Sequence, residues 1–280
     1  MNFVHPFQVL KRARLCRRAA RVRRQRLQAD VPPPWMLPDP GSLIASYPRS
    51  GNTWLSHMVA DVLLQNNGYQ TETVPPINER EIIPDLDRGD LERCQHSDFA
   101  KRPVAKTHLE YMQWMQKGVF LIRQPADVLV SYYHFHKRYP ERLQEVAAGI
   151  EPFCRKFAEQ WYAHALSFIW KCEEDPQDFK AVTYEALMDR THESLGFVLA
   201  HLEIDFTDRQ LSVAVANHEF QKHSAREVSN GSPKFFRNGK KNSAKSELPS
   251  KLFHWINRLC GPLYRRASER SFPTGDGGFH

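Results

Sequence analysis

Three short stretches of this sequence combine cations and hydroxyls in the manner of anion-binding sites. The first, YPRSGNTW, runs from Tyr47 to Trp54 and places Arg49, Ser50 and Gly51 directly before a segment of helical periodicity. Such a turn aims backbone N–H groups and a helix N-terminus at one point, which is a geometry that binds phosphate or sulfate. It does not fit GxxxxGK[ST], because the first glycine is absent and the cation precedes the glycine. Taken alone, the turn could equally be structural, since short motifs often match by chance.

The other two stretches follow further apolar runs. Arg123 ends one run, and Ser131 follows eight residues later, about two helical turns on, so both side chains could reach one phosphate. Lys106-Thr107-His108 ends another run. Parallel strands present their carboxyl ends at one edge of a sheet, where open α/β sheets bind ligands. We therefore expect the three stretches to meet at one anion site.

Alternating apolar runs and amphipathic segments predict the elements that position these residues. The strands are expected at 43–47, 103–107, 118–122 and 179–184, and the helices at 52–65, 125–138, 153–171, 185–202 and 208–219. Strands that alternate with helices predict an α/β fold, in which a central parallel sheet is flanked by helices on both faces. The pattern fades in 66–102, which we interpret as a substrate-binding insertion or lid, and in 222–249, which we expect to be a basic loop.

Length and composition exclude several classes of protein. The chain has 280 residues, 41% hydrophobic and 25% charged, which is ordinary for a globular protein and excludes global disorder. We find no run of eighteen apolar residues, which argues against a membrane-spanning protein, and no signal peptide. Five cysteines without CxxC spacing suggest reduced thiols and a cytoplasmic location. We expect a basic arm and Pro-rich linker over 1–41, one domain over 42–270 and a flexible tail over 271–280.

Much of the positive charge lies in the first residues. Residues 1–30 carry nine Lys or Arg and one acid, Asp30, so the rest of the chain sums to −1 although the total is +7. Residues 31–221 hold 18 basic and 27 acidic side chains, whereas residues 222–280 hold 12 basic and 4 acidic ones. A basic end on an acidic body indicates a local anion site rather than a nucleic-acid surface. Residues 7–27 could form a basic helix, which we interpret as a solvated arm. Peripheral contact with an anionic membrane, or with a nucleic acid or protein partner, is the alternative.

In these motifs the sequence resembles the sulfotransferases that use 3′-phosphoadenosine 5′-phosphosulfate (PAPS). The phosphosulfate loop of that family reads YPKSGTTW, and here Arg49 replaces its lysine and Asn52 its threonine. The family arginine and serine before a Tyr-Tyr pair match Arg123 and Ser131, and its Lys-Thr-His matches Lys106 to His108. The three motifs stand in family order. The resemblance spans about 42–251 and implies a P-loop-like three-layer fold.

Weaker matches follow in the expected order. Tyr184 resembles the tyrosine that contacts adenine, and Phe220 resembles an aromatic of the same site. Arg237, Asn238 and Gly239 resemble the Phe-Arg-Lys-Gly stretch that holds the 3′-phosphate, but asparagine replaces lysine and the following Gly-Asp-Trp-Lys is absent. Lys240 and Lys241 could supply the missing charge, and the altered geometry puts donor affinity in question.

The resemblance implies a metal-free sulfuryl transfer to a hydroxyl or amine of a small-molecule or lipid acceptor. Cations and N–H donors stabilise the leaving phosphate in such a transfer, and Arg49, the amides of Ser50 to Thr53 and Lys106 are our candidates. His108 is the candidate base, since a neutral imidazole can take the acceptor proton near pH 7, and Glu110 could assist it. Trp54 is a candidate for stacking on adenine.

Two other functions remain open at this point. A P-loop phosphotransferase would need a Walker lysine and magnesium ligands that we do not find. A nucleotide-binding protein that has lost turnover is favoured by the altered region after Gly239. The acceptor pocket is expected among 69–102, 111–114 and 132–139, whose aromatic and mixed-charge side chains do not identify one acceptor.

Overall fold

The computed structural model describes residues 14–17, 41–71, 79–88, 104–219 and 243–271. Within this part of the chain, four parallel strands form one sheet in the order β2-β1-β3-β4. Their bounds are β1 (Ser42–Ser46), β2 (Val104–Thr107), β3 (Lys117–Ile122) and β4 (Phe179–Thr183). All four expected strands are therefore present within one or two residues of the predicted bounds.

The register of β1 places the ends of three strands together. Leu43 pairs with Ala105 on one side and with Gly118 on the other. A Cβ atom at Gly118 would lie 2.4 Å from the carbonyl oxygen of Leu43, so only glycine allows this close approach. With this register, Ser46, Thr107 and Ile122 all end at the same edge of the sheet.

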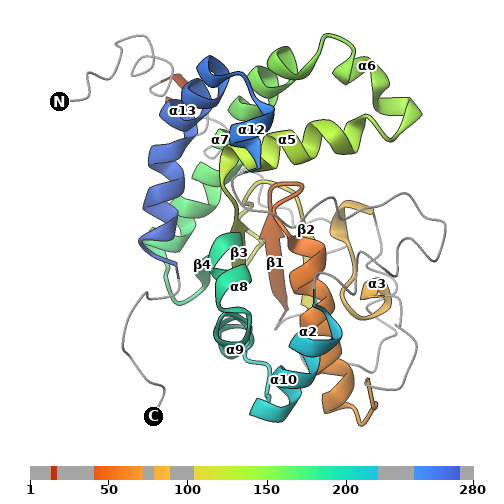
Figure 1. The fold of residues 1–280 in the computed structure, drawn as a ribbon. Helices are drawn as coiled ribbons and strands as arrows, with labels where there is room; N and C mark the ends of the chain where they lie inside the picture. Colours follow the sequence, from red (N-terminus) through yellow and green to blue (C-terminus); the bar gives the residue numbers. More distant parts are fainter. Residues whose placement is uncertain (1–13, 18–40, 72–78, 89–103, 220–242, 272–280) are drawn as a thin grey trace.

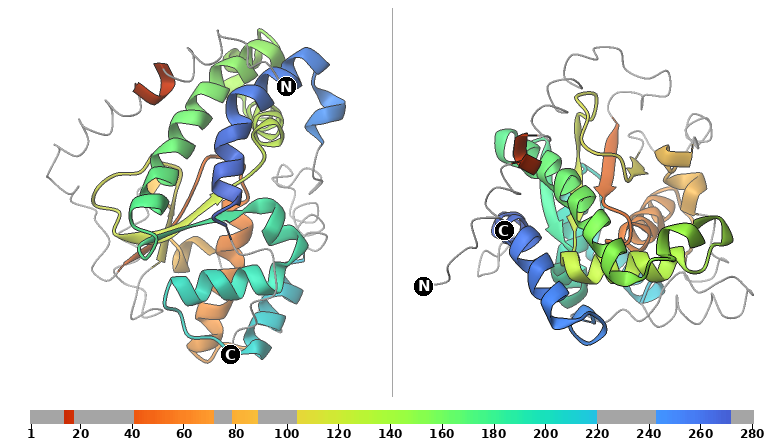
Figure 2. Two further views of the ribbon diagram at one scale, coloured as in Figure 1. Left: turned by 90° about the vertical axis from the view of Figure 1, so that its left-hand side faces the viewer. Right: turned by 90° about the horizontal axis from the view of Figure 1, so that it is seen from above.

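Helices cover both faces of the sheet, which gives the expected three layers. Ile44 and its neighbours on one face pack against α2 (Asn52–Asn66), α9 (Thr191–His201) and α10 (Asp208–Asn217). Leu43, Ala45 and Phe120 on the other face pack against α5 (Pro125–His136), α7 (Ile150–Glu174) and α13 (Ser250–Ser268). Figures 1 and 2 show the two groups of helices on opposite sides of the strands.

Shorter elements connect this framework. They are α3 (Glu79–Ile82), η1 (Leu86–Arg88), η2 (Pro140–Arg142), α6 (Leu143–Val146), α8 (Tyr184–Asp189) and α12 (Ala244–Glu247).

Adjacent strands β1 and β3 lead into helices on opposite faces, α2 and α5. Ligands of open α/β sheets bind where neighbouring strands diverge in this way, so the fold positions a site between the ends of β1 and β3.

The single helix expected over 185–202 is wrong. The chain forms α8 and α9, which are separated at Arg190, whose backbone angles of φ −138° and ψ 62° are not helical. Thr183 caps α8 by accepting a hydrogen bond from the N–H of Ala186 at 3.1 Å. The apolar periodicity continues across the break because both helices pack on the same core.

Helix α13 was not predicted, although its sequence carries a helical pattern. The buried residues of α13 include Leu252, Ile256, Leu259, Leu263 and Ala267, which recur every three or four residues. Pro262 lies inside the helix. Helix α13 packs along α7 and against β4, so it completes one layer of the fold.

Residues 14–17 are helical and belong to the predicted basic arm. Leu15 is buried in the core, and Cys16 Sγ lies 3.4 Å from Tyr162 Oη on α7. This turn of the arm is therefore docked on the domain.

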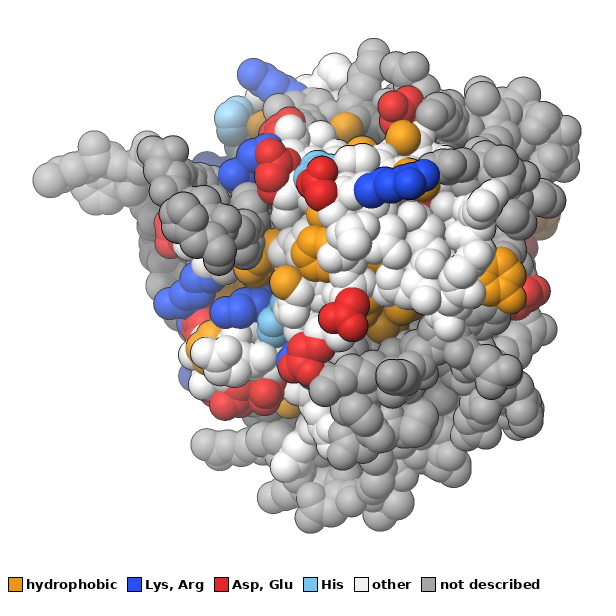
Figure 3. Space-filling model, turned by 90° about the horizontal axis from the view of Figure 1, so that it is seen from below, with side chains coloured by type: hydrophobic (Ala, Val, Ile, Leu, Met, Phe, Trp, Pro, Cys, Tyr) orange, Lys and Arg blue, Asp and Glu red, His pale blue; other side chains and the backbone are white. Residues whose placement is uncertain are grey.

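Seen from below, the described part of the surface carries acidic and basic side chains side by side (Figure 3). No helix of the described residues is long and apolar enough to cross a membrane.

Candidate active site

The turn after β1 holds two residues in the left-handed region of backbone space. Arg49 has φ 71° and Gly51 has φ 102°, and α2 begins immediately afterwards at Asn52. A non-glycine residue at positive φ is uncommon and carries strain, which typically marks a functional turn. The turn brings the side chain of Arg49 and the first N–H groups of α2 to the carboxyl edge of the sheet.

Asn52 fastens this turn to the sheet. Its Nδ2 donates to the carbonyl oxygen of Ile44 at 3.0 Å and to Ser46 Oγ at 3.1 Å, and its Oδ1 accepts from Ser56 at 3.1 Å. The side chain is 3% exposed and faces inward. The predicted contact of Asn52 with the phosphosulfate of the co-substrate would therefore come from its backbone N–H, not from its side chain. Thr53 is partly exposed in the first turn of α2.

Arg49, Ser131 and Arg123 lie together. The Nε atom of Arg49 donates to Ser131 Oγ at 3.3 Å, and its guanidinium lies 5.0 Å from the centre of the Phe135 ring on α5. Arg123, which follows β3, donates from Nη1 to the carbonyl oxygen of Arg49 at 3.3 Å. Two motifs that are distant in the sequence thus form one cationic cluster between β1 and β3.

Tyr184 packs directly against the turn. The Arg123 guanidinium lies over its ring at 4.3 Å, and Trp54 meets it edge-on at 6.1 Å between ring centroids. A Cβ atom at Gly51 would lie 2.6 Å from Tyr184 Cδ2, so the ring occupies the space that any other side chain would need. Burial raises the pKa of Tyr184, and the nearby Arg123 charge acts in the opposite direction. Tyr184 therefore lies at this site as a neutral aromatic.

Buried polar atoms at this cluster include Ser50 Oγ, on a residue 1% exposed, and Arg123 Nε. Neither atom makes a hydrogen bond with any described residue. Nearly all buried polar atoms in native proteins have partners, and an unpartnered one is costly. Hydroxyl and guanidinium donors beside a helix N-terminus fit the oxygens of phosphate or sulfate. The residues that are present therefore suit a polyanionic ligand.

His108 lies at the end of β2, beside β1. Its Nδ1 is 2.8 Å from the carbonyl oxygen of Ser46 and 3.3 Å from Ser46 Oγ. A carbonyl oxygen can only accept, so Nδ1 carries the proton and Nε2 keeps its lone pair. Burial lowers the pKa of His108, which outweighs the opposite effects of the Ser46 carbonyl and of Asp87 and Asp85. The ring is therefore a neutral base at pH 7.

Asp87 holds the end of β2 and was missed in the sequence. It accepts a hydrogen bond from the backbone N–H of His108 at 2.6 Å and from Thr107 Oγ1 at 2.9 Å. Lys106 on the same strand is 6% exposed and pairs in register with Ile44. An acid nineteen residues before Lys106 gave no signal in the sequence, because η1 reaches β2 only in the folded chain.

Glu185 was also missed. It accepts hydrogen bonds from the N–H of Gln124 at 3.1 Å and from Tyr264 Oη at 2.7 Å, and so joins the entry of α5 to α13. Burial raises its pKa, with the two hydrogen bonds acting against this. Its place directly after Tyr184 was the available signal. Glu185 helps fix the segment that carries Arg123.

Several predicted site residues lie outside the described part of the chain: Phe220, Arg237, Asn238 and Gly239, as well as most of the expected acceptor segment 69–102. Of the histidines after Ser131, His134 Nε2 lies 2.8 Å from Glu247 Oε2. His136 is buried, with Nδ1 2.5 Å from Glu145 Oε2. Among the described residues, no group of three or more His, Cys, Asp or Glu side chains is arranged to hold a metal ion.

A parallel sheet flanked by helices, with a tight strand-to-helix turn at its carboxyl edge, defines an α/β protein of the P-loop-like fold. The sequence model of the sulfotransferase domain matches residues 39–268. The chain therefore belongs to the sulfotransferase family.

Named relatives support the same membership. Flavonol 3-sulfotransferase of Flaveria bidentis is 26% identical over 250 residues, which are 77% of this chain and 79% of that protein. Mouse sulfotransferase 6B1 is 26% identical over 64% of this chain, and canine sulfotransferase 1B1 is 27% identical over 64%. The matches span only 60% and 64% of those two relatives.

Solved structures share the fold. Mouse sulfotransferase SULT7A1 complexed with PAP is similar with a TM-score of 0.59 at 19% identity, covering 82% of this chain and 85% of that one. Retinol dehydratase in complex with androsterone and the inactive cofactor PAP gives a TM-score of 0.57 at 18% identity, covering 80% of each chain.

Proposed function

We propose that this protein transfers a sulfuryl group from PAPS to a hydroxyl or amine of a small-molecule or lipid acceptor. The observation that carries the proposal is the cluster of Arg49, Arg123 and Ser131, together with the buried, unpartnered hydroxyl of Ser50, the residue after Arg49. Membership of the sulfotransferase family supports this activity. So does the presence of PAP, the product left by PAPS, in the named solved structure.

The residues divide by the part of the donor that they would hold. Arg49, Ser50 and the backbone amides of Gly51, Asn52 and Thr53 would bind the 5′-phosphosulfate, while Arg123 and Ser131 would bind the 3′-phosphate. The adenine would lie near the aromatic residues Trp54, Tyr184 and Phe220. Arg237, Asn238 and Gly239 are expected to complete the 3′-phosphate site.

Sulfuryl transfer depends on alignment of the reacting oxygens and on stabilisation of negative charge more than on covalent catalysis. The acceptor oxygen attacks sulfur in line with the leaving phosphate oxygen, and negative charge grows on the 5′-phosphate as the bond breaks. The cations Arg49 and Lys106 and the turn amides stabilise that charge without a metal ion. An arginine at position 49 keeps a fixed charge but cannot donate a proton as an acid.

His108 would act as the base. Its hydrogen bond to the Ser46 carbonyl leaves the Nε2 lone pair, and burial keeps the ring neutral. General-base catalysis of this kind typically contributes about 10²-fold or more. Asp87 holds the backbone at His108 and so positions the ring.

The acceptor class is proposed from the surroundings of His108 and from relatives. Tyr111, Met112 and Trp114 are partly buried apolar side chains close after it in the sequence, which suits a phenol, a sterol or a lipid head group. A flavonol sulfotransferase and a 3-beta-hydroxysteroid sulfotransferase are among the relatives. A cytoplasmic location is part of the proposal, and a relative named cytosolic sulfotransferase 12, from Arabidopsis thaliana and 25% identical, supports it.

Peripheral membrane contact through residues 7–27 remains a prediction. Within that arm the structure describes only 14–17, where Leu15 is buried in the domain core. Leu15 is therefore not available to enter a lipid surface, and attachment would depend on the surrounding arginines.

Calorimetric titration with PAP tests the donor site. We expect binding without magnesium and weaker binding of ATP with magnesium. Preferential binding of ATP with magnesium would overturn the proposal in favour of a phosphotransferase. Turnover of a labelled donor on a panel of phenols, sterols and amines then tests the activity. PAP binding without turnover on any acceptor would favour a nucleotide-binding protein instead.

A further inference from the structure

A buried carboxylate lies on α2, two helical turns after the anion-binding turn. Asp61 is 4% exposed, and it accepts hydrogen bonds from Gln65 Nε2 at 2.8 Å, Asn217 Nδ2 at 2.9 Å and His218 Nε2 at 3.0 Å. Burial by itself would raise the pKa of Asp61, but hydrogen bonds from His218, Thr71 and Asn217 outweigh it and the pKa is lowered. The carboxylate is therefore ionised in the folded protein.

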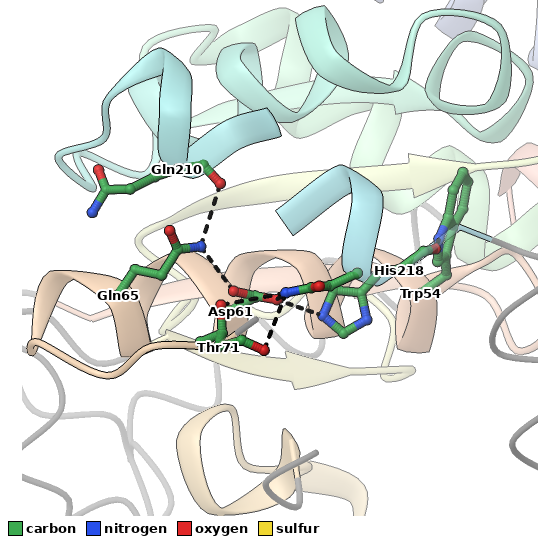
Figure 4. Close-up of polar contacts among 7 residues, drawn as sticks. Trp54, Asp61, Gln65, Thr71, Gln210 and His218 are labelled. Atoms are coloured by element: carbon green, nitrogen blue, oxygen red, sulfur yellow. Dashed lines mark hydrogen bonds and ion pairs between the residues drawn. The ribbon is translucent and has the colours of Figure 1, made fainter. Parts of the chain in front are cut away.

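Asp61 gathers segments that are distant in the sequence. Asn217 also reaches the carbonyl oxygen of Thr71 at 3.4 Å, and Gln65 reaches that of Gln210 at 3.3 Å. Figure 4 shows these side chains converging on Asp61 from α2, from the chain around Thr71 and from the end of α10. The network therefore fixes the end of α10 against the middle of α2.

His218 links this network to the candidate donor site. Its side chain donates to Asp61, while its backbone carbonyl accepts a hydrogen bond from Trp54 Nε1 at 2.8 Å. Figure 4 shows Trp54 and Asp61 on opposite sides of His218. The His57 ring stacks on the His218 ring with 5.7 Å between centroids. The orientation of the Trp54 indole is thus set by a residue that Asp61 holds.

Trp54 in turn borders the residues around the anion-binding turn. Its ring meets Tyr184 edge-on, and Tyr184 fills the space beside Gly51 and underlies Arg123. An indole plane that rotates would change this packing, because Trp54 is 5% exposed and has little room. The Asp61 network is therefore connected by direct contacts to the donor site.

We propose that Asp61 and His218 are positioning residues for donor binding, which they support by fixing the Trp54 indole where the nucleotide base lies. This inference rests on the proposed function. Neither side chain touches the reacting groups, so their loss weakens the binding of substrate and product alike and leaves the chemical step intact.

The test measures PAP affinity by calorimetry and thermal stability on the same variants. Asp61→Asn keeps the shape but removes the charge and one acceptor, and His218→Ala removes the donor. We expect each to raise the PAP dissociation constant about tenfold, within the range of coupling between contacting residues. His218→Gln can still donate to Asp61 and is expected to restore affinity to within about threefold of the parental value.

A matched control separates positioning from loss of stability. His201 is also hydrogen-bonded inside the fold, to the carbonyl oxygens of Gly118 at 3.0 Å and Asp178 at 3.2 Å, near the opposite edge of the sheet. His201→Ala is expected to lower the melting temperature without changing PAP affinity. The milder Asn217→Ala removes one hydrogen-bond donor to Asp61 and should raise the PAP dissociation constant about threefold. This variant tests the inference if Asp61→Asn does not fold.

The link through Trp54 is tested by a double-mutant cycle. In a Trp54→Phe background, the ring cannot donate to His218, so Asp61→Asn should have less than about a twofold further effect. Parental PAP affinity in Asp61→Asn and His218→Ala, or an undiminished effect in the Trp54→Phe background, would overturn the inference alone. A parental protein that does not bind PAP would overturn the proposed function and this inference together.

Discussion

The Nδ1 atom of His108 lies 2.8 Å from the carbonyl oxygen of Ser46, the last residue of the neighbouring strand β1. This contact decides which ring nitrogen can accept a proton, because the carbonyl requires the N–H at Nδ1. The Nε2 lone pair is then left for an acceptor hydroxyl. A parallel pair of strands thus sets both the position and the tautomer of the candidate base.

Replacement of His108 is expected to slow transfer and spare donor binding. His108→Ala should lower kcat by about 100-fold or more, because the general base is lost. PAP affinity, measured by calorimetry, should change less than about twofold. Transfer at the parental rate by His108→Ala would refute the role of base.

The pH dependence of the parental enzyme follows from the same residue. Burial lowers the pKa of His108 from 6.5, so the reactive neutral form persists to a lower pH than for a free imidazole. The kcat/KM of the free enzyme should rise with pH through an apparent pKa below 6.5 and be level at pH 7 to 8. A rise centred above pH 7 would contradict this, and the profile is measured with the donor well below its KM, so that it reports the free enzyme.

Substitution of Gly51 should disrupt the anion-binding turn. In Gly51→Ala the new Cβ would lie 2.6 Å from Tyr184 Cδ2, at a φ of 102° that alanine disfavours. We expect a loss of about 2 kcal/mol or more in stability and PAP binding weakened by at least about tenfold. Gly68→Ala is the control, since Gly68 has φ 84° but nothing within 4 Å of its Cβ position. Equal effects in both variants, by chemical denaturation and calorimetry, would show that the contact with Tyr184 is unimportant.

Arg49 is expected to act by charge at the leaving phosphate. Arg49→Ala should lower kcat by about 100-fold, as when a donor to developing negative charge is removed. Arg49→Lys keeps the charge and should remain within about tenfold of the parental rate, although the paired geometry with Ser131 and Phe135 is lost. Steady-state turnover of labelled donor measures both, and an active Arg49→Ala protein would exclude the assigned role.

Glu185 makes stability depend on pH. Its folded-state pKa is raised by burial above 4.5, so the folded protein holds this proton to a higher pH than the unfolded chain. Stability should therefore fall as pH rises from about 4.5 through the raised pKa, by about 1.4 kcal/mol per unit of pKa increase. Glu185→Gln cannot ionise and should remove this slope in denaturant titrations between pH 4.5 and 8. Glu193→Gln is the control, because Glu193 is exposed, and it should leave the dependence of stability on pH unchanged.

Several features were predictable because they depend on neighbours in the sequence. The strand, turn and helix around Arg49, and the strand and helix that carry Arg123 and Ser131, follow from short apolar runs and helical periodicity. Their convergence followed from a general property of parallel sheets, whose strand ends share one edge. The break at Arg190 and the helix α13 were missed, because tertiary packing decides where α8 ends and α13 lies.

Contacts between distant residues could not be predicted in this way. Asp87 meets His108 across 21 residues, Glu185 meets Tyr264 across 79, and Asp61 meets His218 across 157. Each of these carboxylates looks like an ordinary charged residue in the sequence. They became parts of the site only through contact with partners from other elements.

The sequence by itself determined that an α/β sheet ends in cations and hydroxyls suited to a polyanion, because each of those motifs is a local pattern. Only the tertiary structure decided that His108 carries its proton on Nδ1, that Arg49 reaches Ser131, and that Trp54 is held through His218 by Asp61. The physical reason is that hydrogen bonds and burial join residues by position in space, and strand register and helix packing set those positions.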